Sequence, residues 1–495
     1  VLHVLKTLME PSGPVSVESR ESGGPESTRE AKTGEEWEEP ARPALATDSQ
    51  AQEPQDEVIR QEGYKEWKKK FPGMWTPPQA PEEPYIPPRL ILATDLHYQS
   101  ALAGDGGEAF RLFVERSDGK VVQYLPELLE AFLDEVIEER PSALVLSGDI
   151  TMNGERLNHE ELAARLKRVQ DAGIQVLVIP GNHDINNHDA SVYYGARKEA
   201  APYIDGPEFH EIYHEYGYDQ ALSRDVSSLS YVYALDDRNW LLMLDSCQYE
   251  PDNKVEGRLK DSTMAWADEQ LARAKEEGVF VIPIAHHNLL AQSRMYTIQC
   301  AMDNNGEVIS LLQKYELPLF FSGHLHVQHF MRNNDIGIYE VVTSSLSTPP
   351  CQYGVLDYME DETFYYYTRK VNMEKWARKN KSTDENLLNF DTYSPPVLKR
   401  IFYNQAYDAM KNSAEEETGS IFVKLTESEK QQMAKVYGDI NAACYAGRAY
   451  EVVKEAVKQP GYAMWKEYCY PSILYEYLEY IIEDAVLDYN VLGME

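Results

Sequence analysis

The chain has few cysteines and no long apolar run, and each shortage excludes a class of protein. Its five cysteines are far apart and never form a CxxC pair, so the sequence predicts neither a disulfide framework nor a zinc ribbon. It has no run of about 18 apolar residues, which a transmembrane helix requires. The sequence does not begin with methionine, and its first nine residues, Val1–Met9, form a short apolar stretch. We expect an extracellular or cell-surface protein if an upstream signal was removed, and a cytoplasmic protein otherwise.

Basic residues are also scarce relative to acidic ones. The chain has 47 Lys and Arg against 82 Asp and Glu, which gives a net charge of −35. This charge repels polyphosphate backbones and anionic membrane surfaces. The balance therefore argues against a polymeric nucleic-acid partner and favours a small-molecule substrate.

Length and composition predict three segments. Residues 1–84 are acidic and proline-rich with few aromatic side chains, so they cannot bury enough surface to offset the entropy of ordering. We expect a disordered tail and linker there. Residues 85–375 alternate apolar runs with amphipathic stretches, which is typical of an α/β domain. Residues 376–495 carry only helical periodicity, over 397–410, 427–445 and 473–490, which predicts a helical C-terminal domain.

Two apolar runs, 144–149 and 176–184, form the centre of the predicted α/β domain. Each run breaks at its C-terminal end into glycine and polar residues, which is typical of a buried strand. A helix lies between them, and we expect Asn158 to cap it with Glu161 returning the hydrogen bond. A strand, a helix and a second strand place both polar ends at one edge of a parallel sheet.

Further strands are expected on both sides of this unit. The segment 230–245 alternates and turns in its middle, which predicts a hairpin. The segment 185–225 has no clear period, and we expect it to be irregular. The remaining predicted strands are 89–94, 279–285, 317–322, 336–342, 353–358 and 364–371, and the remaining predicted helices are 123–139 and 264–275.

Polar residues that bind metals follow five of the predicted strands. Carboxylate, imidazole and amide groups suit divalent ions such as Mn, Fe or Zn. There are too many of them for one tetrahedral centre, and one carboxylate can bridge two ions. The residues are Asp95, His97, Asp149, Asn182, His183, His286, His324 and His326.

Each motif alone has an ordinary structural explanation. Gly148-Asp149 could be a simple turn, and a single histidine could be a satisfied core residue. Together, each at the end of a strand, they favour a dinuclear metal site over coincidence. We expect His287 to point away from the ligands, His159 to lie on the surface, and Asn153 and His287 to be weak candidates for substrate binding.

The motifs Asp95-x-His97, Gly148-Asp149, Gly181-Asn182-His183-Asp184, His286 and Gly323-His324-x-His326 resemble the calcineurin-like metallophosphoesterase superfamily. The phrase from Gly148 to Glu155 and the helical C-terminal segment are similar to its bacterial cyclic-nucleotide phosphodiesterase-like members. The resemblance implies a β-sandwich of mixed sheets flanked by helices, plus the C-terminal all-helical domain.

The resemblance also implies residue roles. One metal ion would be held by Asp95, His97, Asp149 and His326. The other would be held by Asp149, Asn182, His286 and His324, so that Asp149 bridges the two. A metal-bridging hydroxide would attack phosphorus in line, with His183 as the catalytic acid and Asp184 orienting it.

These inferences predict a dinuclear phosphoesterase that hydrolyses small phosphodiesters, most readily cyclic nucleotides. A phosphomonoesterase and a glycerophosphodiester or lipid-headgroup phosphodiesterase remain alternatives on the same metal site. A non-catalytic cell-surface binding protein is the alternative of another class, although the complete ligand set together with His183 argues against it.

Overall fold

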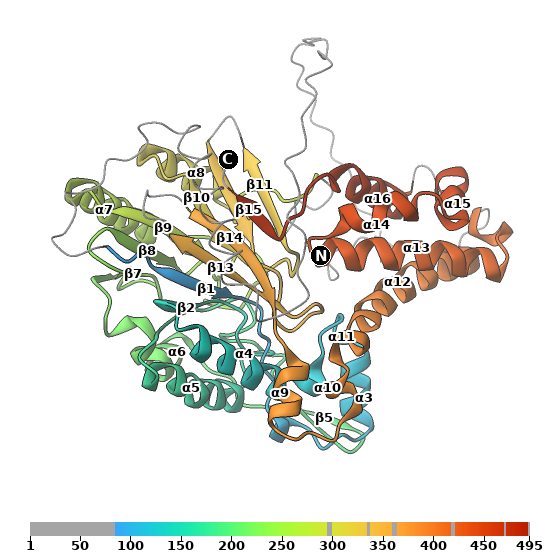
Figure 1. The fold of residues 1–495 in the computed structure, drawn as a ribbon, viewed down its shortest axis with the longest axis horizontal. Coiled ribbons are helices and arrows are strands. Elements are labelled where there is room, and N and C mark those ends of the chain that lie inside the picture. The colour runs from blue at the N-terminus through green and yellow to red at the C-terminus, as the bar shows by residue number, and fades with distance from the viewer. Residues whose placement is uncertain are drawn as a thin grey trace, which may run out of the picture.

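The computed structural model describes residues 85–294, 299–333, 337–358, 364–416, 421–469 and 472–493. The predicted disordered segment 1–84 lies outside these residues. Within them, two mixed β-sheets lie face to face and helices flank both (Figure 1). This arrangement confirms the predicted α/β sandwich of mixed sheets.

The first sheet has six strands in the order β15-β14-β13-β1-β2-β3. Strands β1, β2 and β3 run parallel, whereas β13 pairs antiparallel with β1. The parallel part confirms the strand-helix-strand unit predicted around 144–149. The bounds are β1 (Arg89–Ala93), β2 (Ala143–Ser147), β3 (Gln175–Ile179), β13 (Gln352–Tyr358), β14 (Phe364–Lys370) and β15 (Val491–Gly493).

The second sheet has seven strands in the order β11-β12-β10-β9-β8-β7-β6. Its centre, from β8 to β12, is parallel, and the predicted hairpin is the antiparallel pair β7 and β8. The bounds are β6 (Ser223–Arg224), β7 (Tyr231–Ala234), β8 (Asn239–Leu244), β9 (Phe280–Ala285), β10 (Leu319–Ser322), β11 (His329–Asn333) and β12 (Ile338–Val342).

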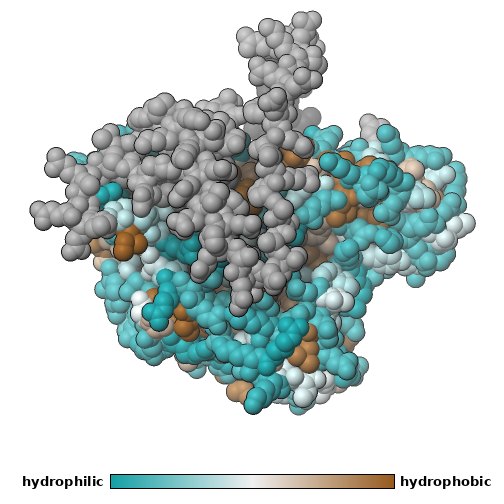
Figure 2. Space-filling view, viewed as in Figure 1, coloured by the Kyte–Doolittle hydropathy of each residue, from teal (hydrophilic) through white to brown (hydrophobic). Residues whose placement is uncertain are grey.

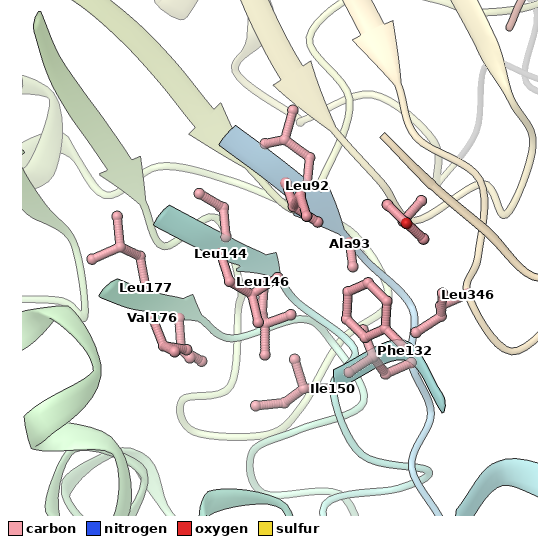
Figure 3. Close-up of a cluster of buried hydrophobic side chains, with 14 of the residues drawn as sticks. Leu92, Ala93, Phe132, Leu144, Leu146, Ile150, Val176, Leu177 and Leu346 are labelled. Atoms are coloured by element: carbon pink, nitrogen blue, oxygen red, sulfur yellow. The ribbon is translucent and has the colours of Figure 1, made fainter. Parts of the chain in front are cut away.

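A continuous apolar core joins the two sheets to the helices on the first one. Strands of both sheets contribute buried side chains to it. Figure 3 shows Leu144 and Leu146 of β2 near Val176 and Leu177 of β3, with Phe132 of the neighbouring helix α4 (Leu125–Glu139) in the same cluster. Burial on both faces explains why these strands read as uninterrupted apolar runs.

Helices α4, α5 and α6 lie along the first sheet, and α7 and α8 lie along the second (Figure 1). The predicted cap of α5 is wrong. The helix begins at Arg156, so Asn158 lies inside it. The side-chain oxygen of Asn158 accepts a hydrogen bond from the amide of Ser100, and its Nδ2 atom donates to the carboxylate of Glu155. The bounds are α3 (Glu108–Glu115), α4 (Leu125–Glu139), α5 (Arg156–Asp171), α6 (Gly206–Tyr213), α7 (Asp261–Glu277) and α8 (Asn305–Lys314).

The segment 185–225, predicted to be irregular, contains regular elements. Strands β4 (Ser191–Tyr194) and β5 (Arg197–Ala200) form a small hairpin. Helix α6 follows, and Asp205 and Glu208 close its first turn with a capping box. The expectation was therefore wrong for much of this segment.

The C-terminal part is helical, as predicted, and its apolar cluster also contains Leu325, Val327 and Val342 of the α/β domain. Its last element, β15, returns to the first sheet and pairs with β14. The domain boundary between residues 375 and 376 stays a prediction. It falls inside α9, where Lys375 donates a hydrogen bond to Glu138 in α4 of the α/β domain. The bounds are α9 (Met373–Lys379), α10 (Glu385–Leu388), α11 (Phe390–Tyr393), α12 (Pro395–Glu416), α13 (Glu427–Tyr445), α14 (Ala449–Ala456), α15 (Pro460–Tyr468) and α16 (Ile473–Asp484).

The coloured part of the surface in Figure 2 is mostly hydrophilic, with hydrophobic residues in scattered patches. Within the described residues, no helix is both long and apolar enough to cross a membrane. This finding agrees with the lack of long apolar runs in the sequence.

Candidate metal centre and active site

The predicted metal-binding residues converge at the carboxyl ends of strands from both sheets. Strands β1, β2 and β3 deliver one group of them, and β9 and β10 deliver the other. All the side chains are buried or half-buried. The residues are Asp95, His97, Asp149, Asn182, His183, His286, His324 and His326.

The backbone at this edge adopts a conformation that side chains rarely tolerate. Five of the predicted ligands have positive φ angles between 43° and 70°. Such left-handed conformations cost free energy and persist only where the surrounding structure imposes them. Their concentration at one place is typical of a functional site. The residues are Asp95, His97, Asp149, His324 and His326.

Three motif glycines allow the loops to approach one another closely. A Cβ atom at Gly148 would lie 2.5 Å from Nδ1 of His286, and one at Gly181 would lie 2.1 Å from the backbone nitrogen of Asp149. A Cβ atom at Gly323 would lie 2.1 Å from Oγ1 of Thr94. Any side chain here would therefore push the predicted ligands apart.

Asp95, His97, Asp149 and His326 form a first cluster, in which one donor atom from each residue lies within 4.8 Å of the others. Nε2 of His326 lies 3.1 Å from both Oδ1 of Asp95 and Nε2 of His97. Oδ2 of Asp149 lies 3.9 Å from Nε2 of His97. Oδ1 of Asp95 is buried and accepts no hydrogen bond of good geometry from the described residues.

Asn182, His286 and His324 form a second cluster on the other side of Asp149. Oδ1 of Asn182 lies 3.2 Å from Nε2 of His286 and 3.0 Å from Nδ1 of His324. Nε2 of His286 also lies 3.3 Å from Oδ2 of Asp149. The same carboxylate oxygen therefore faces both clusters.

This donor set fits two divalent ions. Donors that bind one ion at about 2.1 Å lie about 3 Å apart when they are adjacent, which matches the shorter separations in both clusters. Metal-binding histidines usually donate their other N–H group to an oxygen atom. His286 does so to the carbonyl of Ser147 at 2.9 Å, and His324 does so to that of Gln299 at 2.7 Å.

Charge and burial prepare the clusters for cations. Burial lowers the pKa of His324 to about 3 and that of His97 well below its usual value, so both rings are neutral and offer a lone pair. Burial would raise the pKa of Asp149, but the adjacent histidines, His286 first, hold it well below its usual range. Burial opposes protonation of His286, but Asp149 raises its pKa to about 9, so this ring has to release a proton before it can bind an ion.

His183 lies at the edge of the clusters, with its ring centroid 4.9 Å from that of His97. Its Nδ1 atom lies 2.9 Å from the carbonyl of Met152 and 2.9 Å from Oδ1 of Asn153. Both partners are acceptors, so Nδ1 carries a proton. The other nitrogen, Nε2, lies 4.0 Å from Oδ2 of Asp149.

Asp184 does not orient the His183 ring directly, which corrects the prediction. Its buried carboxylate accepts hydrogen bonds from the amides of Ile150, Thr151 and Gly181. Burial, with Asp149 nearby, raises its pKa to about 7. Asp184 therefore holds the Asp149 turn against the loop that carries Asn182 and His183.

Two other histidines have structural roles. His287 lies near His286 and His324, but both of its ring nitrogens are used, by Ser246 and by the carbonyl of Val255. Its ring centroid lies 5.0 Å from that of His286 and 4.6 Å from that of His324, so the expectation that His287 points away from the ligands is wrong. Its candidacy for substrate binding stays a prediction. The prediction that His159 lies on the surface is also wrong, since it is buried and bonds the carbonyl of Asp184.

Two contacts that support the site could not be read from motifs. The carbonyl of Gln299 fixes the ring of His324, and Nδ2 of Asn253 donates to the carbonyl of Asn182 at 2.7 Å. Both come from loops without regular structure, and no spacing rule connects them to the ligands.

Comparison with known protein families agrees with this geometry. Residues 88–328 match the family described as calcineurin-like phosphoesterase. This part of the chain is therefore similar to calcineurin-like phosphoesterases. Residues 372–488 match a second family, described as the C-terminal domain of cyclic nucleotide phosphodiesterase. Together the two matches confirm the resemblance that the motifs indicated.

Calcineurin-like phosphoesterases are phosphoric ester hydrolases with a dinuclear metal centre, so the match over residues 88–328 supports the predicted enzyme class. The chain is 30% identical over 110 residues to the uncharacterized metallophosphoesterase YkuE of Bacillus subtilis (strain 168). That match covers 22% of this chain and 38% of the relative. The chain therefore matches well under half of the relative's length.

Two solved structures resemble the chain at low identity. A dimetal phosphatase from Danio rerio is 15% identical and has a TM-score of 0.42. The match covers 57% of this chain and 95% of the phosphatase chain. A putative 5'-nucleotidase from Staphylococcus aureus is 12% identical and has a TM-score of 0.35. The match covers 63% of this chain and 58% of the nucleotidase chain.

Proposed function

We propose that the chain is a dinuclear metal-dependent phosphodiesterase that hydrolyses small phosphodiesters, with cyclic nucleotides as the favoured class. One observation carries this proposal: the two donor clusters meet at Asp149, and His183 lies beside them with its Nε2 atom toward the same carboxylate. The match of residues 372–488 to the C-terminal domain of cyclic nucleotide phosphodiesterase supports the substrate class.

The proposed ligands divide between two ions. Asp95, His97 and His326 would hold one ion, and Asn182, His286 and His324 the other, with Asp149 shared. Manganese, iron and zinc all suit these oxygen and nitrogen donors. When bound, such ions neutralise phosphoryl charge and lower the pKa of coordinated water.

His183 is the proposed acid. The carbonyl of Met152 and Oδ1 of Asn153 hold its Nδ1–H group, which leaves Nε2 to donate a proton to the departing oxygen. Asn153, a weak candidate for substrate binding, is thereby better explained as a residue that positions His183. A binding protein without catalysis would not need this arrangement.

The net charge of −35 supports a small substrate rather than a polymer. Long polyphosphate chains would be repelled over a large surface, whereas one phosphodiester group needs only the local field of the site. The buried position of the donor clusters agrees with a substrate that inserts a single phosphoryl group.

A substrate panel tests the proposal. The full chain, loaded with Mn²⁺, is assayed on 3',5'-cyclic nucleotides, p-nitrophenyl phosphate and a glycerophosphodiester. We expect the highest kcat/KM on cyclic nucleotides, and no turnover after removal of metal by a chelator. Preference for the monoester would show a phosphomonoesterase. Preference for the glycerophosphodiester would place the substrate among lipid headgroups.

A further inference from the structure

Glu340 of β12 is a fully buried carboxylate that is not among the proposed metal ligands. Its Oε1 atom accepts hydrogen bonds from the amide of Leu289 at 2.8 Å and from Oγ of Ser322 at 2.6 Å. Its Oε2 atom accepts from the amide of Leu290 at 2.6 Å and from Nε2 of Gln292 at 2.7 Å. Burying a charge costs free energy, so a carboxylate held by four donors calls for a reason.

The four donors come from the two segments that carry the histidines of the second donor cluster. The segment 289–292 follows His286, and Ser322 precedes His324 by two residues. Oδ1 of Asn182 contacts both of these histidines. The separation of the two segments therefore sets the separation of the donors in this cluster.

Asn288 links the same two segments directly. Its Nδ2 atom donates to Oγ of Ser322 at 2.8 Å and to the carbonyl of Gly323 at 3.2 Å. The hydroxyl of Ser322 thus accepts from Asn288 and donates to Glu340. One continuous network of hydrogen bonds fixes the two segments against each other.

The outer end of this network reaches helix α16 in the C-terminal helical region. Oε1 of Gln292 accepts from Nδ1 of His329 at 2.8 Å, and Nε2 of His329 lies 3.1 Å from Oδ2 of Asp484. The hydroxyl of Tyr480 donates to the carbonyl of Gln292 at 2.9 Å. Both Tyr480 and Asp484 belong to α16. The helix is therefore joined to the second donor cluster through Gln292 and Glu340.

We propose that Glu340 positions the metal ion of the second cluster, and that helix α16 supports the same ion through Gln292. This inference rests on the proposed function, which requires an ion held by Asn182, His286 and His324. Residues that orient metal ligands commonly change metal affinity although they touch no ion. Glu340 is a positioning residue in this sense, since it bonds the segments that carry the ligands.

Stepwise Mn²⁺ binding by the metal-free full chain, measured by calorimetry, tests this role without requiring turnover. Glu340→Gln keeps the shape of the side chain but replaces one acceptor oxygen with a donor group. Burial raises the pKa of Glu340 to about 7, so binding is measured at about pH 8, where most of the carboxylate is ionised. Asp225→Asn is the control. Asp225 is also a buried carboxylate with four hydrogen bonds, but its partners Ser227, Ser228 and Thr263 adjoin no proposed ligand.

Tyr480→Phe tests the contribution of α16, because it removes the hydroxyl that bonds Gln292. Tyr462→Phe is its control. The hydroxyl of Tyr462 also contacts α16, through Glu479 at 2.6 Å, but both of these residues belong to the helical region. Asn182→Ala identifies the ion of the second cluster, because this variant should lose that binding step.

We expect Glu340→Gln to weaken binding at the second cluster by about 10- to 100-fold, as substitutions behind metal ligands commonly do. The affinity of the first cluster should change by less than about twofold. Turnover of bis(p-nitrophenyl) phosphate should fall at limiting Mn²⁺ and recover in excess Mn²⁺. Tyr480→Phe should weaken binding at the second cluster by about 3- to 10-fold, which is typical of one neutral hydrogen bond. Both controls should keep both affinities within about twofold.

Unchanged binding at the second cluster in Glu340→Gln would overturn the inference. An equal loss at both clusters, or the same loss in Asp225→Asn, would also overturn it, since either would show a general structural role. An unchanged affinity in Tyr480→Phe would overturn the part assigned to α16. If Glu340→Gln does not fold, Tyr480→Phe decides alone.

The proposed function fails separately, if the unmodified chain binds two ions but hydrolyses no phosphodiester. In that case a selective loss of the second ion in Glu340→Gln would still support the positioning role.

Discussion

The backbone amide of His183 donates a hydrogen bond of 2.7 Å to Oδ1 of Asp149, while Oδ2 of the same carboxylate faces both donor clusters. One side chain thus joins the proposed acid to the proposed metal centre. A change at Asp149 would disturb metal binding and acid placement together, so the two roles have to be separated with substitutions elsewhere.

Asn182 separates metal binding from proton transfer. Its Oδ1 atom contacts both histidines of the second cluster, so Asn182→Ala should weaken only the ion on that side. We expect about one ion per chain at limiting Mn²⁺ and partial recovery of turnover in excess Mn²⁺. Metal analysis after dialysis measures the occupancy, and retention of two tightly bound ions would remove Asn182 from the ligand set.

His183→Ala should leave both ions bound and lower kcat by about 10² to 10⁴, the usual worth of a general acid. A ribose hydroxyl leaves poorly without a proton, whereas p-nitrophenolate needs little help. The variant should therefore lose more activity on a cyclic nucleotide than on bis(p-nitrophenyl) phosphate. Equal losses on both substrates would show that His183 stabilises phosphoryl charge, and loss of metal would show that it is a ligand.

Gly119→Ala tests whether helix α12 supports the first donor cluster, because a Cβ atom at Gly119 would lie 2.6 Å from Cδ1 of Leu398. The loop after Gly119 reaches the cluster through the amide of Val121, which donates to the carbonyl of Ser347, and the hydroxyl of Ser347, which donates to the carbonyl of Asp95. The control is Gly173→Ala, because Gly173 has a similar φ of +84° but open space where the Cβ atom would lie. Both variants should lose about 1 to 2 kcal/mol of stability from the left-handed conformation. Only Gly119→Ala should also lower kcat/KM. Equal kinetics in the two variants would show that the contact with Leu398 is unrelated to catalysis.

His159 should make the fold less stable in acid. Burial lowers its pKa to about 3 in the folded chain, whereas the unfolded value is about 6.5. Below about pH 6.5 His159 binds a proton in the unfolded state, whereas in the folded state it stays neutral down to about pH 3. The free energy of unfolding therefore falls as the pH decreases through this range. Between about pH 7.5 and pH 5.5 the loss from this residue is about 1.4 kcal/mol.

His159→Gln should remove that part of the pH dependence. Urea unfolding of the metal-free chain at both pH values, with and without the substitution, measures it. His159→Gln will be less stable at neutral pH, because the bonds to Tyr213 and the carbonyl of Asp184 are disturbed. An identical pH dependence in both chains would mean that His159 takes up a proton when folded.

The sequence predicted the core of the site because its residues follow short buried strands. Asp149 and Asn182 lie where two parallel strands end, and parallel strands bring their carboxyl ends to one edge. Their motif glycines mark the tight approaches between loops. The proximity of these side chains could therefore be inferred without coordinates.

What the sequence did not predict depends on tertiary contacts. His159 carries no pattern that distinguishes a buried from an exposed helical position, and its burial follows from packing against α6. Asparagine is a residue type that often caps helices, but the side-chain oxygen of Asn158 accepts a hydrogen bond from the amide of the distant Ser100. The capping box of Asp205 and Glu208 was visible in the sequence and should have predicted α6.

Titration of the metal-free chain with Mn²⁺, with turnover of bis(p-nitrophenyl) phosphate followed at each addition, tests the central claim most directly. The two clusters that share Asp149 predict that two ions bind per chain and that turnover requires the second. Saturation of binding and turnover at one ion per chain, or no turnover with both ions bound, would contradict a dinuclear phosphodiesterase.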